Sequence, residues 1–99
     1  MSRPRKHRVV SIEPGVTYFK PRAVPLSRLE EITLTVSELE ALRLCDCQGL
    51  DQTDAAKEMK ISQPTFHRLL KAGRKKTSDA LANGKAIKIE GGTYKLKRR

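Results

Sequence analysis

The stretch that most constrains the fold of this chain runs from residue 51 to residue 73, where two helix starts follow each other closely. Asp51 and Ser62 are N-cap residues, and each precedes a helix-forming segment, the second of which opens with Pro64. Only Lys60 and Ile61 separate the end of the first segment from the second cap. Two helices joined so closely cross at an angle and share one apolar wedge, which is the pattern of a helix-turn-helix.

The residues inside this unit fit such packing. Ala55 and Ala56 are small enough to let the two helices approach closely. The wedge between the helices is then filled by larger apolar side chains, namely Met59, Ile61, Phe66 and Leu70. The sequence therefore predicts a shared core for the two helices.

Further helical signals lie on both sides of the unit. Thr35 stands three residues before Glu38 in a capping-box arrangement, and Gly49 ends the helix that this box begins. The helix after Ser62 meets no strong stop before Asn83-Gly84, so it extends over about five turns. The predicted helix-turn-helix domain spans residues 35–84, and the predicted fold class is mainly α.

Short β segments are expected on the N- and C-terminal sides of this domain. Residues 1–8 form a basic arm, and residues 9–34 are extended, with a β-hairpin across Pro14-Gly15 and a short helical turn within 26–32. Residues 85–99 are predicted to form a second β-hairpin across Gly91-Gly92, followed by a basic tail.

The charge of the chain points to a polyanionic partner. Lys and Arg number 21 against 11 Asp and Glu, which gives a formal net charge of +10. Nucleic acid is the expected partner, and an ordinary solvated basic surface is the alternative. An anionic membrane ranks low because the basic residues do not lie opposite one continuous apolar helix face. No run is long and apolar enough for a membrane span or a signal peptide, so a cytoplasmic location is expected.

The exposed positions of the second helix are the candidate DNA contacts. Its first turns can enter the major groove of double-stranded DNA. The residues that point away from the Phe66 and Leu70 stripe, or lie at the leading end, are Ser62, Gln63, Thr65, Arg68 and Lys71. Arg74, Lys75 and Lys76 follow two turns later and are expected to meet phosphates. For any one of these residues, an ordinary solvated helix face is the competing interpretation.

Two further candidate contacts have equally simple alternatives. His67 is either a neutral surface residue or a ligand of a phosphate or base. Arg3, Arg5 and Lys6 of the N-terminal arm either follow the minor groove or only improve solubility.

Catalysis and metal binding are not expected. The chain has no nucleophile with a neighbouring base, no paired carboxylates and no glycine-rich phosphate loop. His7, His67, Cys45 and Cys47 match no zinc spacing, and no cofactor is predicted. Cys45 and Cys47 point to different faces of a helix, so they are interpreted as partly buried thiols.

Three functions compete on these observations. The first is a transcription regulator that reads duplex DNA. A homodimer is an open possibility for it, with apolar surface from Ile87, Ile89, Tyr94 and Leu96. The second is a module that binds RNA polymerase or another protein through Glu38 and Glu40. The third is an RNA-binding protein, which is disfavoured because Tyr18 and Phe19 are adjacent and would face opposite sides of a strand.

Two family resemblances bear on these functions, and the second function would retain the sigma-like fold of the first resemblance. Thr35-x-x-Glu38-Leu39-x-x-Leu42-x-Leu44, Gly49-Leu50, Ala55-Ala56, Ile61-Ser62 and Thr65-Phe66 resemble the region-four helix-turn-helix of bacterial sigma factors, up to about Leu70. Nearly the whole chain is similar to the small predicted DNA-binding proteins of domain of unknown function 134, matched by Arg3-Pro-Arg-Lys6, Phe19-Lys-Pro21, Pro25, Glu38-Leu-Glu-Ala-Leu-Arg-Leu44 and Asp46. The resemblance implies DNA binding in transcription.

Two positions depart from those patterns. Lys60 stands in the turn where such motifs usually have Gly, and Gly73 stands where the family tends to have Ala. A left-handed Lys60 would cost on the order of 1 kcal/mol, and Gly inside a helix costs about as much relative to Ala. Both positions influence how the helices are oriented.

Overall fold

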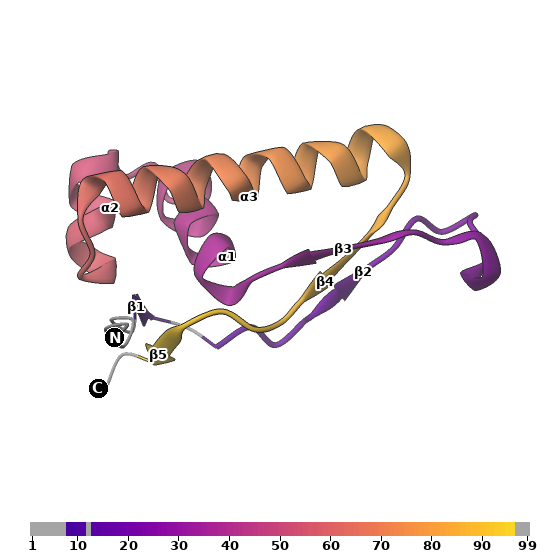
Figure 1. Cartoon of the computed structure of the whole chain (residues 1–99), viewed down its shortest axis with the longest axis horizontal. Coiled ribbons are helices and arrows are strands. Elements are labelled where there is room, and N and C mark those ends of the chain that lie inside the picture. Colours follow the sequence, from indigo (N-terminus) through magenta and orange to yellow (C-terminus); the bar gives the residue numbers. More distant parts are fainter. Residues whose placement is uncertain (1–7, 12, 97–99) are drawn as a thin grey trace, which may run out of the picture.

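The computed structural model describes residues 8–11 and 13–96. The predicted contacts Arg3, Arg5 and Lys6 and the basic tail at 97–99 lie outside the described residues. Three α-helices form one side of the molecule, α1 (Val36–Leu42), α2 (Gln52–Met59) and α3 (Gln63–Asn83). In Figure 1, α3 runs along the upper side of the molecule, with α2 at its start and the sheet strands beneath it.

The helix boundaries follow their caps. Thr35 and Glu38 form the predicted capping box at the start of α1, and the side chains of Asp51 and Ser62 cap α2 and α3. Gly84 ends α3 in a left-handed conformation, with φ at 64°. A five-residue π-helix, η2 (Arg43–Cys47), continues directly from α1. The three helix starts are set by local side-chain to backbone bonds and the end of α3 by a glycine, which is why a sequence can predict them.

The fold is a mixed α+β structure, so the prediction of a mainly α fold is wrong. About half of the described residues are helical and 18% are in strands, which form two small sheets. In one sheet, β4 (Ala86–Ile89) lies between β2 (Tyr18–Phe19) and β3 (Glu31–Leu34). In the other, β1 (Arg8–Val10) pairs in parallel with β5 (Tyr94–Leu96). The strands thus join the two ends of the chain and are part of the core.

Among residues 8–11 and 13–96, neither predicted β-hairpin forms. β1 and β2, on either side of Pro14-Gly15, belong to different sheets, and so do β4 and β5. Gly91 and Gly92 do turn the chain with positive φ, but the turn leads past the start of α1, where the Val36 N–H donates to the Gly91 carbonyl at 3.2 Å. A Cβ on Gly92 would lie 3.0 Å from that of Thr35. These glycines therefore let the chain pass close to the start of α1. The same pair of residues is typical of a two-residue hairpin turn, and this is the origin of the hairpin prediction.

The segment between β2 and α1 also differs from the prediction. Only a short 3-10 helix, η1 (Leu26–Arg28), forms within the expected helical turn at 26–32. β3 begins at Glu31 and pairs in parallel with β4, from Glu31 opposite Ala86 to Leu34 opposite Ile89. The partner strand lies more than fifty residues away in sequence, so no local pattern specifies β3.

The core has two parts that meet at α1. The predicted wedge forms one part, in which Met59, Phe66 and Leu70 are almost fully buried together with Ala55 and Ala56. The other part joins the sheets to α1 through Val10, Leu34, Val36 and Ile89. Gly73 lies where α3 crosses α1, because a Cβ there would be 3.2 Å from both the Glu38 carbonyl oxygen and Leu42 Cγ. A glycine at this position permits close contact between the two helices.

Candidate nucleic-acid interface

The connection between α2 and α3 is short and held by hydrogen bonds to both helices. Lys60 ends α2 in the left-handed conformation, with φ 54° and ψ 45°, and its N–H donates to the Lys57 carbonyl. The Ile61 N–H donates to the Ala56 carbonyl at 3.1 Å, and Ser62 Oγ accepts from the Thr65 N–H at 3.3 Å. The turn thus fixes where α3 begins, although the residue in the left-handed conformation is a lysine rather than a glycine.

The buried face of α3 determines which side chains remain outside. Phe66, Leu70, Gly73 and Ala80 are buried against the rest of the fold. Helical periodicity then directs residues 68, 71 and 75 away from the core. Arg68, Lys71 and Lys75 are all exposed, and none of them forms an ion pair with another described residue. We call these three residues the outer cations of α3.

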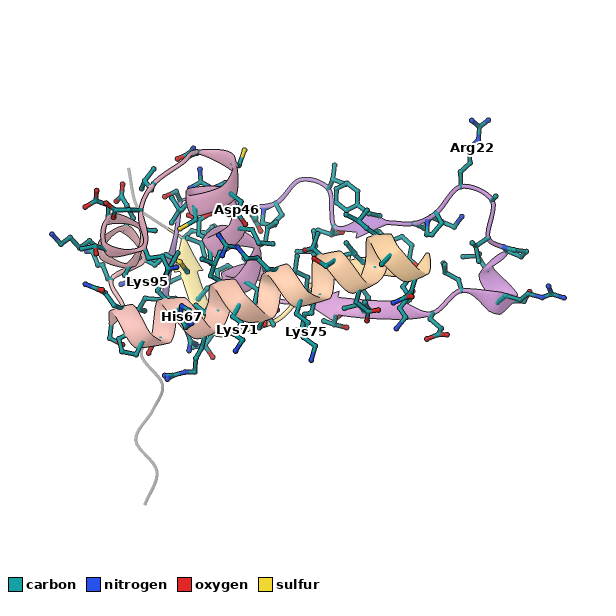
Figure 2. The ribbon with its side chains drawn as sticks, turned by 90° about the horizontal axis from the view of Figure 1, so that it is seen from above. Arg22, Asp46, His67, Lys71, Lys75 and Lys95 are labelled. Carbon is teal, nitrogen blue, oxygen red and sulfur yellow. The ribbon has the colours of Figure 1, made fainter. Side chains whose placement is uncertain are left out.

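Figure 2 shows that Lys71 and Lys75 project from the same side of α3, with His67 near its start. The exposed His67 ring has Nδ1 3.3 Å from Oε1 of Gln52, the first residue of α2. The first turn of α2 therefore lies beside His67, the residue that precedes Arg68. Sequence reasoning did not select Gln52, although its place directly after the Asp51 cap marks it as a residue of an exposed helix start.

The polar residues at the start of α3 divide into two groups. Ser62 Oγ donates to Thr65 Oγ1 at 2.9 Å, and Arg68 donates to the same oxygen at 3.3 Å. Ser62 and the half-buried Thr65 are thus engaged in the cap and in positioning Arg68. Gln63 is exposed at the first turn and free to face a ligand.

The other predicted phosphate contacts have partners within the fold. Arg74 forms a bidentate pair with Asp46 at 2.7 and 3.1 Å, and its hydrogen bonds lower the pKa of the Asp46 carboxyl. Asp46 lies on the opposite side of α3 from Lys71 and Lys75 (Figure 2). Lys76 reaches Glu38 at 2.7 Å. Of residues 74–76, only Lys75 therefore lacks an ion pair with another described residue.

The carboxylates proposed as a protein contact are inside the molecule. Glu38 and Glu40 are only 7% and 3% exposed. Glu40 accepts from Arg43 at 2.7 and 2.8 Å and from the Ser11 N–H at 3.0 Å. Burial by itself would raise the pKa of Glu40, but the Arg43 and Ser11 hydrogen bonds outweigh it and lower the pKa below its ordinary value. Neither side chain offers a surface for a partner.

The apolar residues suggested for dimer formation are largely used within the fold. Ile89 is 5% exposed in the core, where Ile87 and Tyr94 pack against it and its neighbours. Only Leu96, at 42% exposed, is open to solvent. A dimer would need a different surface.

The cysteines and acidic residues give no sign of a metal centre. Cys45 and Cys47 are free thiols, half-buried and exposed respectively, and burial raises the pKa of Cys45. Within residues 8–11 and 13–96, no three His, Cys, Asp or Glu side chains are grouped as metal ligands would be. Nor does this part of the chain contain a helix that is both long and apolar enough to cross a membrane.

A family model described as "Protein of unknown function DUF134" matches residues 1–97. The chain belongs to this family. A UPF0251 protein of Caldanaerobacter subterraneus subsp. tengcongensis is 58% identical over 97% of this chain and 81% of its own length. A UPF0251 protein of Thermoanaerobacter pseudethanolicus is 55% identical, with the same coverage of both chains. No solved structure matches this DUF134 protein significantly.

Proposed function

We propose that this DUF134 protein binds double-stranded DNA and regulates transcription, with α2 and α3 acting as a helix-turn-helix. The observation that carries the proposal is the row of outer cations, Arg68, Lys71 and Lys75, on a helix whose start is exposed beside α2. The same end of the molecule presents Gln63, Gln52 and His67. A polyanion with hydrogen-bonding edges is the partner that such a surface fits.

The dimensions of this surface suit a major groove. Arg68 and Lys75 are seven residues apart, which corresponds to roughly 10 Å along a helix. The major groove is about 12 Å wide and admits a helix whose exposed side chains face its floor and walls. In this arrangement Lys71 and Lys75 meet phosphates on the groove walls.

The leading end of α3 would supply the base contacts. An exposed glutamine such as Gln63 can donate and accept on the edge of adenine, and an arginine such as Arg68 can bond both acceptors of guanine. The Thr65 hydroxyl, which already accepts from Arg68, supports the guanidinium from one side. Gln52 and His67 lie where the first helix of such a motif passes a phosphate.

Selection from a random duplex library, followed by sequencing and salt titration, tests this proposal. We expect one enriched motif, and we expect Arg68→Ala to weaken binding to it about 10-fold or more and to relax one base position. Arg22→Ala is the matched control, because Arg22 is an exposed cation at the other end of the molecule (Figure 2). Absence of a motif, with equal salt-sensitive binding of wild type and both variants, would refute base reading by α3.

A second candidate function is binding of RNA polymerase or another protein. Glu38 and Glu40 no longer support it, but an open hollow of about 580 Å³ lies on the Asp46 side of the helices, lined by Leu39, Leu42, Arg43, Asp46, Cys47 and Thr77. A partner seated there would leave the outer cations free. Loss of partner binding in Leu39→Glu, with Arg68→Ala unaffected, would favour this candidate.

A further inference from the structure

The end of α3 opposite to the outer cations is apolar and open. Leu81 is 80% exposed and Phe19 is 53% exposed, although both are large hydrophobic residues. They line one hollow of about 270 Å³, together with Pro21, Ala80 and Ile87. The loop from Lys20 to Glu30 extends past the same end of the molecule (Figure 1) and carries Leu26, which is 74% exposed.

We propose that this surface, here called the Phe19–Leu81 groove, joins two copies of the chain about a two-fold axis and thereby sets the spacing of two DNA half-sites. Only the part of this inference that concerns DNA half-sites rests on the proposed function. Pairing of the two copies can be tested without DNA. A two-fold contact uses the same patch on both copies, so one groove per chain is sufficient.

The length of α3 supports this arrangement. Arg68 and Leu81 are thirteen residues apart, which corresponds to about 20 Å along the helix. Two copies that meet at Leu81 with collinear α3 helices place their Arg68 residues about 40 Å apart, and inclined helices bring them closer. Successive major-groove faces on one side of DNA are about 34 to 36 Å apart. The distance from the groove to the outer cations therefore matches one turn of DNA.

The charges around the groove support a second copy as the occupant. Lys20 and Lys85 line it, and Lys85 lies 3.1 Å from Asp79 and 3.8 Å from Glu30. The Glu30 side chain is 78% exposed. A rim with both signs of charge lets a cation of one copy face a carboxylate of the other. On a chain with net charge +10, such a mixed rim makes self-association less costly at this end.

Sedimentation equilibrium of the full chain without DNA tests the pairing. We expect wild type to sediment as two copies, and Leu81→Glu and Phe19→Glu to sediment as one. Both side chains are exposed, so neither change disturbs the core, and circular dichroism verifies the fold. Val16→Glu is the control, because Val16 is 61% exposed and does not line the groove, so it should pair like wild type. A monomeric wild type, or a dimer that survives both groove variants, overturns the proposal.

DNA binding then separates the two proposals. We expect the enriched site to contain two inverted half-sites one turn apart, bound at least ~100-fold more weakly by Leu81→Glu, with unchanged affinity for an isolated half-site. If wild type pairs through the groove but binds no duplex, pairing is upheld and the proposed function fails. If one copy binds one undivided site, DNA binding is upheld and the spacing role of the groove is wrong.

Discussion

The outer face of α3 and the buried sides of α1 hold charges in opposite states. On the outer face, Arg68, Lys71 and Lys75 extend into solvent without an ion pair to any described residue. At α1, the buried Glu38 is paired with Lys76 of α3, and the buried Glu40 with Arg43. Lysines and arginines along a basic segment are therefore not equivalent. Those with an internal partner stabilise the fold, and those without one are available to a polyanion.

Removing the outer cations should have the largest effect and tests this division directly. We expect Arg68→Ala/Lys71→Ala/Lys75→Ala to weaken DNA binding by about 100-fold or more at moderate salt. The slope of log affinity against log salt should fall by about 2, because Lys71 and Lys75 each meet a phosphate and each phosphate contact contributes about 0.9. Fluorescence anisotropy with a labelled duplex, titrated at several salt concentrations, measures both quantities.

The matched control removes two cations that have ion-pair partners, Arg74 and Lys76, and is compared with Lys71→Ala/Lys75→Ala so that both variants lose two charges. Arg74→Ala/Lys76→Ala should lower the urea midpoint of unfolding and change the salt slope much less than Lys71→Ala/Lys75→Ala does. Equal loss of DNA affinity in these two double variants would mean that net charge alone, and not its placement on α3, determines binding.

Glu40→Gln tests the buried charges of α1, and its expected effect is on the stability of the fold. The neutral amide cannot accept the Arg43 pair and the Ser11 N–H as the carboxylate does, and we expect a loss of about 2 kcal/mol in the free energy of unfolding at neutral pH. Because the pKa of Glu40 is lowered on folding, its contribution is fully present above the ordinary value of 4.5 and is lost as pH falls through the lowered value. The free energy of unfolding of wild type should therefore approach that of Glu40→Gln as pH falls. Urea unfolding of both proteins from pH 7 down to pH 3 measures this approach.

Glu13→Gln provides the comparison for that experiment. Glu13 is exposed and forms no ion pair with another described residue, so its replacement should change the free energy of unfolding by less than about 0.5 kcal/mol. A difference between wild type and Glu40→Gln that stays constant down to pH 3 would contradict the assigned role of the Glu40 carboxylate.

The helices could be predicted from sequence because their limits are local. Thr35, Asp51 and Ser62 each bond the backbone of a residue three positions later, so the signal and its effect lie within one turn. The left-handed residue at the α2 end is equally local, and Lys60 adopts it even without a glycine. The wedge of Met59, Phe66 and Leu70 follows from helical periodicity alone.

The strands could not be predicted because their partners are distant. β1 pairs with β5 at the other end of the chain. β4 pairs with β2 and β3, both of which lie more than fifty residues earlier in the chain. Turn signals at Gly91-Gly92 specify a reversal but not which strand the chain joins next. Gly73 shows the same limit in the helices. Helix propensity makes glycine unfavourable at this position, and only the approach of α1 shows that a Cβ there would be in tight contact, 3.2 Å from the Glu38 carbonyl oxygen.

The candidate site was predictable only in part, for a related reason. Periodicity placed Arg68 and Lys71 outside, but it placed Arg74 and Lys76 outside as well. Their partners, Asp46 and Glu38, lie 28 and 38 residues earlier in the chain, and only the crossing of α1, η2 and α3 brings them together. Whether a cation on the surface is free to bind a polyanion thus depends on tertiary structure.

Asp46→Asn should give the smallest change, an increase in DNA affinity of about 3-fold. Asp46 holds Arg74 by two hydrogen bonds on the side of α3 away from Lys71 and Lys75, and a neutral asparagine would release the guanidinium to a nearby phosphate (Figure 2). One added phosphate contact should steepen the salt slope by about 0.9. Because net charge also rises by one, the decisive comparison is Glu13→Gln, which raises net charge equally and leaves the Arg74 pair intact. If the gain comes from the freed Arg74, Glu13→Gln lacks it, and if Glu13→Gln shows the same gain, the pair with Asp46 does not limit DNA binding.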